Sequence, residues 1–365
     1  MDNRRMDESK TLWHMDRVIE HFDKGQKVAP VHIDMGIAKF CNVKCVFCYG
    51  MFQNIQSGVY IKRDALLQTM DDAGEIGVKS IGFIGDGEPT CNPHVYEAIR
   101  RGKANGLDMA ISTNGVLVNT DAKRDAILDS SNWMRFCLSA GTREGYEKIH
   151  GVDKFATVMR NVEAIVEQRD KGNYHCDIGF QAVFVPTLMA REMVEEAKLA
   201  VKMGVDYFVI KQCSLPDVEN KSGMMDFDLN DYDNPEIKEA LLEAESLSND
   251  RTKIIPKWNV MAQKGERPYD GCPSIPLISE MSGNGDWYPC GYMFGDKPEF
   301  ADYKFGNVHD NSLKEIFQSD RYWDIVKTMR EDFDVHTQCH GCCRQEQVNR
   351  FVSNYLNTPR GTNFI

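Results

Sequence analysis

Residues 31–48 read VHIDMGIAKFCNVKCVFC, an apolar strand-like run followed by three cysteines in the pattern CxxxCxxC. Cys41, Cys45 and Cys48 lie within eight residues, and one aromatic side chain, Phe47, stands beside the last of them. Three thiolates from one short loop can hold three irons of a cubane iron–sulfur cluster and leave the fourth iron open to a ligand that is not protein. Structural zinc usually takes four ligands in pairs, and no fourth ligand with suitable spacing is close in the sequence. The pattern therefore favours such a cluster over zinc or over passive core thiols.

The bulk composition describes a globular chain. Its 365 residues, 42% of them hydrophobic, have room for one large core and a smaller unit. Neither a secretion signal nor a membrane-spanning apolar run is visible, which predicts a soluble, cytoplasmic protein without a membrane partner. Twelve cysteines without such a signal indicate metal ligands or reactive thiols rather than disulfides. The net charge of −12 argues against a nucleic-acid partner, since binding phosphates relies on Lys and Arg.

The order of apolar runs predicts the fold. After an amphipathic helix over residues 12–22, short apolar runs alternate with helical segments, as in βα units around a parallel sheet. The expected strands are 31–35, 80–84, 108–112, 134–139, 178–185 and 207–211. The glycines expected to end helices in the left-handed conformation are Gly77, Gly106, Gly172 and Gly204. Six units predict an α/β fold, a partial (β/α)6 TIM-type barrel with functional groups at the carboxyl ends of the strands.

The alternation stops after the sixth strand, which suggests a division into four parts. Residues 1–29 form an N-terminal helical extension, and 30–214 form the barrel. Residues 215–270 connect it to the next unit and contain one helix near 237–247 and a strand-like run at 253–258. Residues 271–365 form a small C-terminal unit, expected to hold a β-hairpin and a helix.

The C-terminal unit contains a second set of thiols. Single cysteines at Cys272 and Cys290 are followed by a compact group, Cys339, Cys342 and Cys343. Widely separated cysteines plus a CxxC are typical of four ligands of one cluster or of zinc, and spacing alone does not separate the two. We expect Cys272, Cys290, Cys339 and Cys342 to be the ligands, with Cys343 as a neighbour or a rival of Cys342.

The CxxxCxxC loop resembles that of the radical S-adenosylmethionine (SAM) superfamily. In that family the amino and carboxylate groups of SAM chelate the fourth iron, and an electron from the 4Fe-4S cluster cleaves SAM to a 5'-deoxyadenosyl radical. The resemblance implies an external electron donor such as flavodoxin or ferredoxin. The C-x12-G-x4-C run from Cys272 to Cys290 is similar to the opening of the SPASM extension of these enzymes. Val348 stands where a full SPASM domain has its next cysteine, a departure that matches the shorter twitch version with a second, auxiliary 4Fe-4S cluster.

Two turns at successive strand ends extend the resemblance. The run GDGEP at 85–89 looks like the family's GGEP element, which receives the SAM ammonium, and STNG at 112–115 has groups suited to ribose hydroxyls or a carboxylate. Each could also be an ordinary turn, and glycine there lets backbone approach a ligand closely. The cofactor-binding positions that the resemblance implies are Phe47, Tyr49, Gly85, Asp86, Gly87, Glu88, Pro89, Ser112, Thr113, Asn114, Ser139 and Gln181.

The resemblance also implies a range of reactions. Twitch architecture is similar to that of a cyclitol dehydrogenase of aminoglycoside biosynthesis, so we expect oxidation or epimerisation of a sugar-like, cyclitol or nucleoside-derived small molecule. Cys213, just after the sixth strand, either packs as a small apolar side chain or returns a hydrogen atom, as in some family epimerases.

Two other functions remain open. One is peptide modification, for which the roughly thirty residues before the first strand leave little room for a leader-binding domain. The other is a non-catalytic iron–sulfur carrier or zinc-stabilised binding module, which has no need for the GDGEP and STNG turns.

Overall fold

The computed structural model describes residues 8–48, 56–213, 227–295, 297–339, 343–358, 360 and 362–363. Within this part of the chain one sheet of ten strands has the order β10-β9-β8-β1-β2-β3-β4-β5-β6-β7. The strands are β1 (His32–Met35), β2 (Ser80–Phe83), β3 (Asp108–Thr113), β4 (Trp133–Cys137), β5 (Asp177–Phe184), β6 (Tyr207–Gln212), β7 (Lys253–Pro256), β8 (Ile278–Met281), β9 (Asp286–Tyr288) and β10 (Gly306–Asn307).

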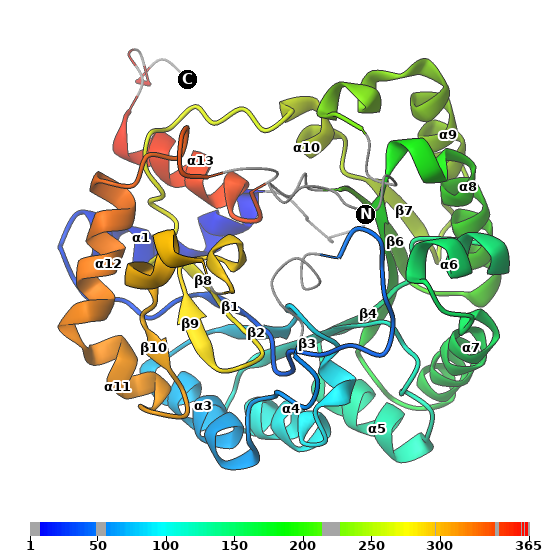
Figure 1. Cartoon of the computed structure of the whole chain (residues 1–365), viewed down its shortest axis with the longest axis horizontal. Helices are drawn as coiled ribbons and strands as arrows, with labels where there is room; N and C mark the ends of the chain where they lie inside the picture. Colours follow the sequence, from blue (N-terminus) through cyan, green and yellow to red (C-terminus); the bar gives the residue numbers. More distant parts are fainter. Residues whose placement is uncertain are drawn as a thin grey trace.

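The sheet is a partial barrel. Strands β1 to β7 pair in parallel with their neighbours, and they curve so that helices cover the outer face (Figure 1). The six expected strands are confirmed, with bounds that agree within two residues. The barrel is larger than expected, because β7 pairs with β6 and β8 pairs in parallel with the free edge of β1. The antiparallel strands β9 and β10 continue the sheet beyond β8.

Helices follow the strands in the expected βα order. They are α1 (Met15–Phe22), α3 (Arg63–Ile76), α4 (Val95–Ala104), α5 (Asp121–Ser130), α6 (Arg143–His150), α7 (Phe155–Lys171), α8 (Pro186–Met203), α9 (Pro235–Ser246), α10 (Trp258–Gln263), α11 (Leu313–Gln318), α12 (Asp320–Glu331) and α13 (Glu346–Leu356). Short 3₁₀ helices are η1 (Glu8–His14), η2 (Pro89–Cys91), η3 (Leu229–Asp233), η4 (Gly291–Met293) and η5 (Pro298–Tyr303).

The glycines at the helix ends behave in two ways. Gly77 and Gly204 end α3 and α8 in the left-handed conformation, and Gly106, one residue beyond the cap of α4, also has positive φ. The same expectation is wrong for Gly172, whose backbone is extended with φ −96°. A side chain there would meet the ring of Tyr174, so this glycine provides space rather than a left-handed turn.

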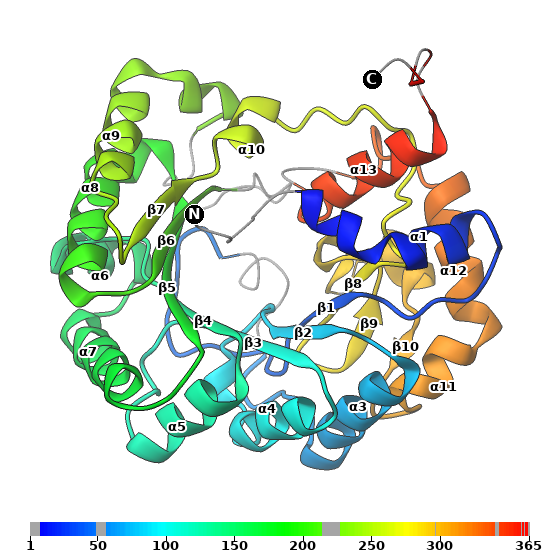
Figure 2. The same cartoon turned by 180° about the vertical axis from the view of Figure 1, so that it is seen from behind.

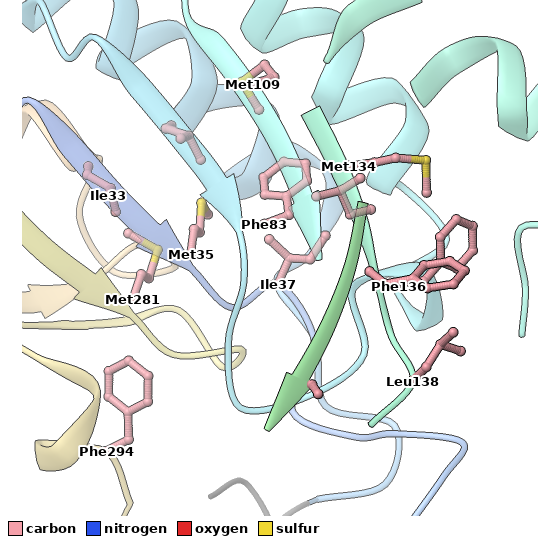
Figure 3. Close-up of a cluster of buried hydrophobic side chains, with 14 of the residues drawn as sticks. Ile33, Met35, Ile37, Phe83, Met109, Met134, Phe136, Leu138, Met281 and Phe294 are labelled. Atoms are coloured by element: carbon pink, nitrogen blue, oxygen red, sulfur yellow. The ribbon is translucent and has the colours of Figure 1, made fainter. Parts of the chain in front are cut away.

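The two faces of the barrel strands differ in character. Met134 and Phe136 of β4 are fully buried in the core between sheet and helices, while Trp133, Arg135 and Cys137 alternate with them and face the barrel interior. Figure 3 shows part of the buried cluster, including Ile33, Met35, Phe83, Met109, Met134 and Phe136. TIM barrels usually fill the interior with branched apolar side chains. The polar inner face here is suited to holding a ligand.

The first and last long helices pack together. Helices α1 and α13 lie side by side in both views (Figures 1 and 2), and Val18, Leu277 and Val352 form a small second cluster there. The hydroxyl of Tyr355 donates a hydrogen bond to Asp23 over 2.6 Å. The C-terminal helix is thereby fixed beside β1 and β8. No helix in the described residues is long and apolar enough to cross a membrane.

Candidate active site

The loop with Cys41, Cys45 and Cys48 leaves the sheet at the carboxyl end of β1 and is held by backbone hydrogen bonds from two sides. The amide of Glu88 donates to the carbonyl of Phe40 over 2.9 Å. The amides of residues 44 and 46 donate to carbonyls at the end of α6, over 2.8 and 2.9 Å. The loop is therefore anchored by two elements of the barrel.

The three thiols are partly buried and act on one another electrostatically. Burial, followed by the charges of Cys48 and Cys41, raises the pKa of Cys45 well above its ordinary value. Burial and then Glu88 raise the pKa of Cys41 to about 12. A metal centre reverses this effect, because its positive charge stabilises thiolates.

The donor set matches an iron–sulfur cluster with an open iron in type and number. Among the described residues, no group of three His, Cys, Asp or Glu side chains is already arranged to hold a metal ion. The individual ligand assignments therefore stay predictions.

His150, at the end of α6, contacts the Cys loop. Its Nδ1 lies 3.0 Å from Sγ of Cys45, and its Nε2 contacts the carbonyl oxygen of Leu138. The ring of Tyr146 packs on it with centroids 4.2 Å apart. Burial lowers the pKa of His150 to about 4, which favours the neutral ring. Sequence reasoning missed this contact, because the two residues are 105 positions apart and the histidine lies in an ordinary amphipathic helix.

The GDGEP loop packs directly against the Cys loop. A Cβ on Gly87 would overlap the carbonyl oxygen of Ala38 and lie 2.7 Å from that of Phe40, and a Cβ on Gly85 would overlap Gly36. Glycine is therefore required at both positions for this close approach.

The carboxylate of Asp86, in the same loop, points to the C-terminal unit. It accepts hydrogen bonds from the hydroxyl of Ser282 over 2.7 Å and from the amide of Gly283 over 2.8 Å.

The carboxylate of Glu88 joins the loops after β2 and β3. It is buried and accepts hydrogen bonds from the amide of Thr90 (3.0 Å), the hydroxyl of Thr113 (2.6 Å) and the amide of Asn114 (2.8 Å). Pro89 follows it as the first residue of η2 and is also buried. Because the side chain is used inside the protein, the backbone of this loop is the part left to meet a SAM ammonium.

Other predicted SAM-binding positions differ in their surroundings. Asn114 lies beside the Cys loop, with Nδ2 3.6 Å from Sγ of Cys41. Ser139 has φ 54°, and its hydroxyl accepts a hydrogen bond from the amide of Val183 over 3.1 Å.

Four more positions complete this set: Gln181, whose Nε2 lies 3.6 Å from Sγ of Cys137, and the three that follow. Ser112 contacts Sγ of Cys137 through its hydroxyl, over 3.1 Å. Phe47 is partly buried against the core, and Tyr49 lies outside the described residues. The SAM-binding role of all these positions remains a prediction.

A charged group lines the inner face near β1. Nε2 of His32 lies 2.8 Å from Oδ1 of Asp34, and Nε of Arg344 donates to Oδ2 of the same carboxylate over 2.8 Å. Burial alone would raise the pKa of Asp34, but Arg344 and His32 more than offset it and hold the pKa well below its usual range. The sequence offered one usable signal, the polar residues His32 and Asp34 at alternate positions of the strand.

Cys213 lies at the end of β6 and is buried within the main hydrophobic cluster. Its amide donates to the hydroxyl of Tyr232 over 2.8 Å, and that hydroxyl donates to the carbonyl of Phe184 over 2.6 Å. This setting is what a packing role requires. The hydrogen-donor role stays a prediction.

The C-terminal thiols gather near the start of α13. Nδ2 of Asn349 lies 3.3 Å from Sγ of Cys272, and burial raises the pKa of Cys272 to about 11. Burial, and then Cys272 and Cys339, raise the pKa of Cys343 well above its ordinary value. Cys290 is partly buried, and desolvation, followed by Glu280 and the neighbouring thiols, raises its pKa well above the ordinary value. Cys343 therefore belongs to this group, while Cys342 lies outside the described residues.

Comparisons with known proteins agree with this geometry. The family model of the radical SAM superfamily matches residues 35–179, and the SPASM iron–sulfur cluster-binding domain matches residues 280–343. A tungsten-containing aldehyde ferredoxin oxidoreductase cofactor-modifying protein of Pyrococcus furiosus is 24% identical over 84% of this chain and 86% of its own. The Fe-coproporphyrin III synthase of Methanosarcina barkeri is 25% identical over 88% and 82%.

A solved structure shows the same fold. SuiB of Streptococcus suis, bound to SAM, superposes with a TM-score of 0.65 at 16% identity, over 88% of this chain and 73% of its own, and SuiB has also been solved with the precursor peptide SuiA. The cofactors of such a domain pair are a 4Fe-4S cluster with SAM and auxiliary iron–sulfur. The chain therefore belongs to the radical SAM superfamily and carries a C-terminal SPASM-type iron–sulfur cluster-binding domain.

Proposed function

We propose that the protein abstracts a hydrogen atom from a C–H bond of a sugar-like, cyclitol or nucleoside-derived small molecule, giving oxidation or epimerisation. The observation that carries the proposal is the packing of the GDGEP and STNG loops against the Cys loop, with Asn114 next to Cys41 and Gly87 against Ala38. A 4Fe-4S cluster held by Cys41, Cys45 and Cys48 would, when reduced, supply the electron for cleavage of SAM to the abstracting radical. An external donor such as flavodoxin or ferredoxin delivers that electron.

The inner face of the barrel supports a hydroxyl-bearing substrate. Ser112, Cys137 and Gln181 form a connected polar row across three neighbouring strands, with contacts of 3.1 and 3.6 Å. Such groups donate and accept hydrogen bonds and can orient a substrate whose C–H bond must face the SAM site.

The position of the C-terminal thiols favours oxidation over epimerisation. Arg344 directly follows Cys343 and reaches Asp34 on the inner face, so the segment expected to hold the auxiliary cluster adjoins the barrel interior. A single auxiliary cluster of the twitch type there would accept an electron from the substrate. A hydrogen donor is needed for epimerisation, and the buried Cys213 is the candidate that the sequence singles out.

A second candidate function is peptide modification. It is favoured by the likeness to SuiB, which has been solved with a precursor peptide. The two substrates call for different sites, since a peptide needs an extended surface at the mouth of the barrel and a small molecule needs only the inner face.

The deciding experiment is anaerobic. Reconstituted protein is incubated with SAM and a reductant, and 5'-deoxyadenosine is measured with and without deuterated sugars, cyclitols, nucleosides and peptides. Transfer of deuterium from a small molecule into 5'-deoxyadenosine is expected. Transfer only from peptides would replace the proposal by the second candidate, and absence of any SAM cleavage would favour a carrier.

A further inference from the structure

We propose that the inner face of the barrel binds a carboxylate or phosphate group of the substrate between the guanidinium of Arg135 and the ammonium of Lys211. The inference rests on the proposed function, because it states the charge of the small molecule that this barrel takes. Its grounds are the placement of two cations, the lack of a carboxylate partner for either among the described residues, and the side-chain amide of Gln181 between them.

The register of the sheet places these side chains along one stretch of its inner face. Arg135 of β4 pairs with Gly179 of β5, and Lys211 of β6 pairs with Val183 of β5. Gln181 lies midway between Gly179 and Val183 on the strand between the two cations. All three side chains alternate with the outward-facing core residues, so they share the inner face.

The two cations have no anionic partner within the described part of the chain. Nε of Arg135 donates to the hydroxyl of Ser112 over 3.2 Å, and its guanidinium lies over the ring of Trp133 at 4.6 Å. Neither Arg135 nor Lys211 is within ion-pair distance of a carboxylate there. Arg344, by contrast, is paired with Asp34 at 2.8 Å.

The surroundings disfavour the charged form of Lys211, although Asp34 and Cys137 act in the opposite direction. Burial, followed by the charges of Arg135 and Arg344, lowers the pKa of Lys211 well below its usual value. Holding like charges close together in a partly buried site is unfavourable, and an anion between them removes this repulsion. Charge-assisted hydrogen bonds from guanidinium and ammonium groups to carboxylate or phosphate are among the stronger ones in proteins.

Gln181 supplies an independent observation. Its side chain is 9% exposed, Nε2 contacts Sγ of Cys137, and Oε1 is buried without a hydrogen-bond partner in the described part of the chain. A buried acceptor of this kind is usually satisfied in the functional state. A hydroxyl group beside the anionic group of the substrate would donate to it.

The test uses reconstituted, SAM-loaded protein and two probes, inorganic phosphate and acetate, titrated calorimetrically at constant ionic strength. At least one probe is expected to bind, and Arg135→Gln and Lys211→Gln each weaken it about tenfold or more. Tighter binding of phosphate indicates a phosphorylated substrate, and tighter binding of acetate indicates a carboxylic acid. The matched control is Arg100→Gln, which removes an exposed charge paired with Asp125 and leaves binding unchanged.

Arg135→Lys and Lys211→Arg are controls for misfolding of the charge-removing variants. They keep the positive charge and are expected to retain measurable binding. The inference is overturned if neither probe binds the wild type, or if binding is the same in both charge-removing variants. It is also overturned if Arg135→Gln weakens SAM instead of the probes, since the guanidinium would then serve the cofactor. Deuterium transfer from an uncharged candidate substrate into 5'-deoxyadenosine in the same wild-type preparation tests the proposed function separately, because it requires no anion.

Discussion

The guanidinium of Arg344 donates a hydrogen bond from Nε to Oδ2 of Asp34 over 2.8 Å, which joins the segment after Cys343 to the first barrel strand. The carboxylate is buried and the arginine is about half exposed. Arg344→Met removes the guanidinium partner of Asp34 and is expected to lower the free energy of unfolding by about 1–3 kcal/mol. The measurement is urea unfolding of metal-free protein.

The double variant with Asp34→Asn provides the check on this pair. If the two residues interact as the structure indicates, the double variant loses less stability than the sum of the single variants. Strict additivity would show that the pair contributes nothing in solution.

Cys45 is expected to be essential for SAM cleavage. Cys45→Ala removes one of three thiolates, so the protein should lose the iron of the SAM-binding cluster and stop forming 5'-deoxyadenosine. The control is Cys176→Ala, since Cys176 is buried beside β5 and away from the loop. Iron content and 5'-deoxyadenosine are measured after anaerobic reconstitution. Normal product from the Cys45 variant would contradict the cluster assignment.

Gly87 is expected to tolerate no side chain. Gly87→Ala pushes a methyl group into the carbonyl of Ala38 and displaces the Cys loop, so 5'-deoxyadenosine formation should fall roughly 100-fold while the fold persists. Gly106→Ala is the matched control, because φ there is +79° but nothing lies within 4 Å of the new methyl group. It should lose about 1 kcal/mol of stability and keep the activity. Equal activity of the two variants would contradict the requirement for glycine at position 87.

The buried carboxyl group of Glu196 on α8 is expected to lower the stability of the folded protein at neutral pH. It is fully buried, and burial followed by the charge of Glu192 raises its pKa well above the ordinary value. The folded state therefore retains a proton that the unfolded state releases above about pH 4.3, and stability falls as pH rises through that value. Glu196→Gln should stabilise metal-free protein by about 1–3 kcal/mol at pH 7.5 and flatten this dependence.

Glu192, one turn earlier on α8, is the natural comparison for Glu196. Its carboxylate accepts hydrogen bonds from the amides of Gly141 and Thr142 over 2.9 and 3.0 Å. Glu192→Gln should therefore lower stability at the same pH. Urea unfolding between pH 5 and pH 8 measures both variants, and a loss of stability in Glu196→Gln would refute the expected sign.

The Cys213→Ala variant distinguishes a hydrogen-donor role of this thiol in epimerisation from a packing role. If the thiol returns a hydrogen atom, Cys213→Ala should still cleave SAM and abstract hydrogen from the substrate but release no epimer. If it only packs, the variant should lose about 1 kcal/mol of stability and keep its turnover. Substrate turnover and deuterium incorporation from D2O distinguish these results.

The alternation of apolar runs was enough to predict six strands of the barrel. Each of the six expected strands carries two or more core residues in period-two order, as Met134 and Phe136 do in β4. The strand over residues 278–281 was not predicted to join the barrel, because its partner β1 is far away in sequence and no local pattern specifies such a pairing.

The parts of the site that are defined by local residue spacing could be predicted from the sequence. Contacts between residues that only the fold brings together could not. The Cys loop and the two turns could be found from the sequence alone. The contacts of His150 with Cys45 and of Arg344 with Asp34 join residues more than a hundred positions apart. Arg135 was detectable in principle, since a charged residue at an alternate position of an apolar strand marks a polar inner face.

The parallel pairing of β1 with β8 has a consequence for the integrity of the molecule. If the chain were cut before residue 271, β1 would lose its neighbour β8. It would then be an exposed edge strand with unpaired backbone amide and carbonyl groups. Exposed edge strands pair with strands of other molecules and so promote aggregation. The C-terminal unit thus shields the most reactive part of the protein from self-association, in addition to any role in electron transfer.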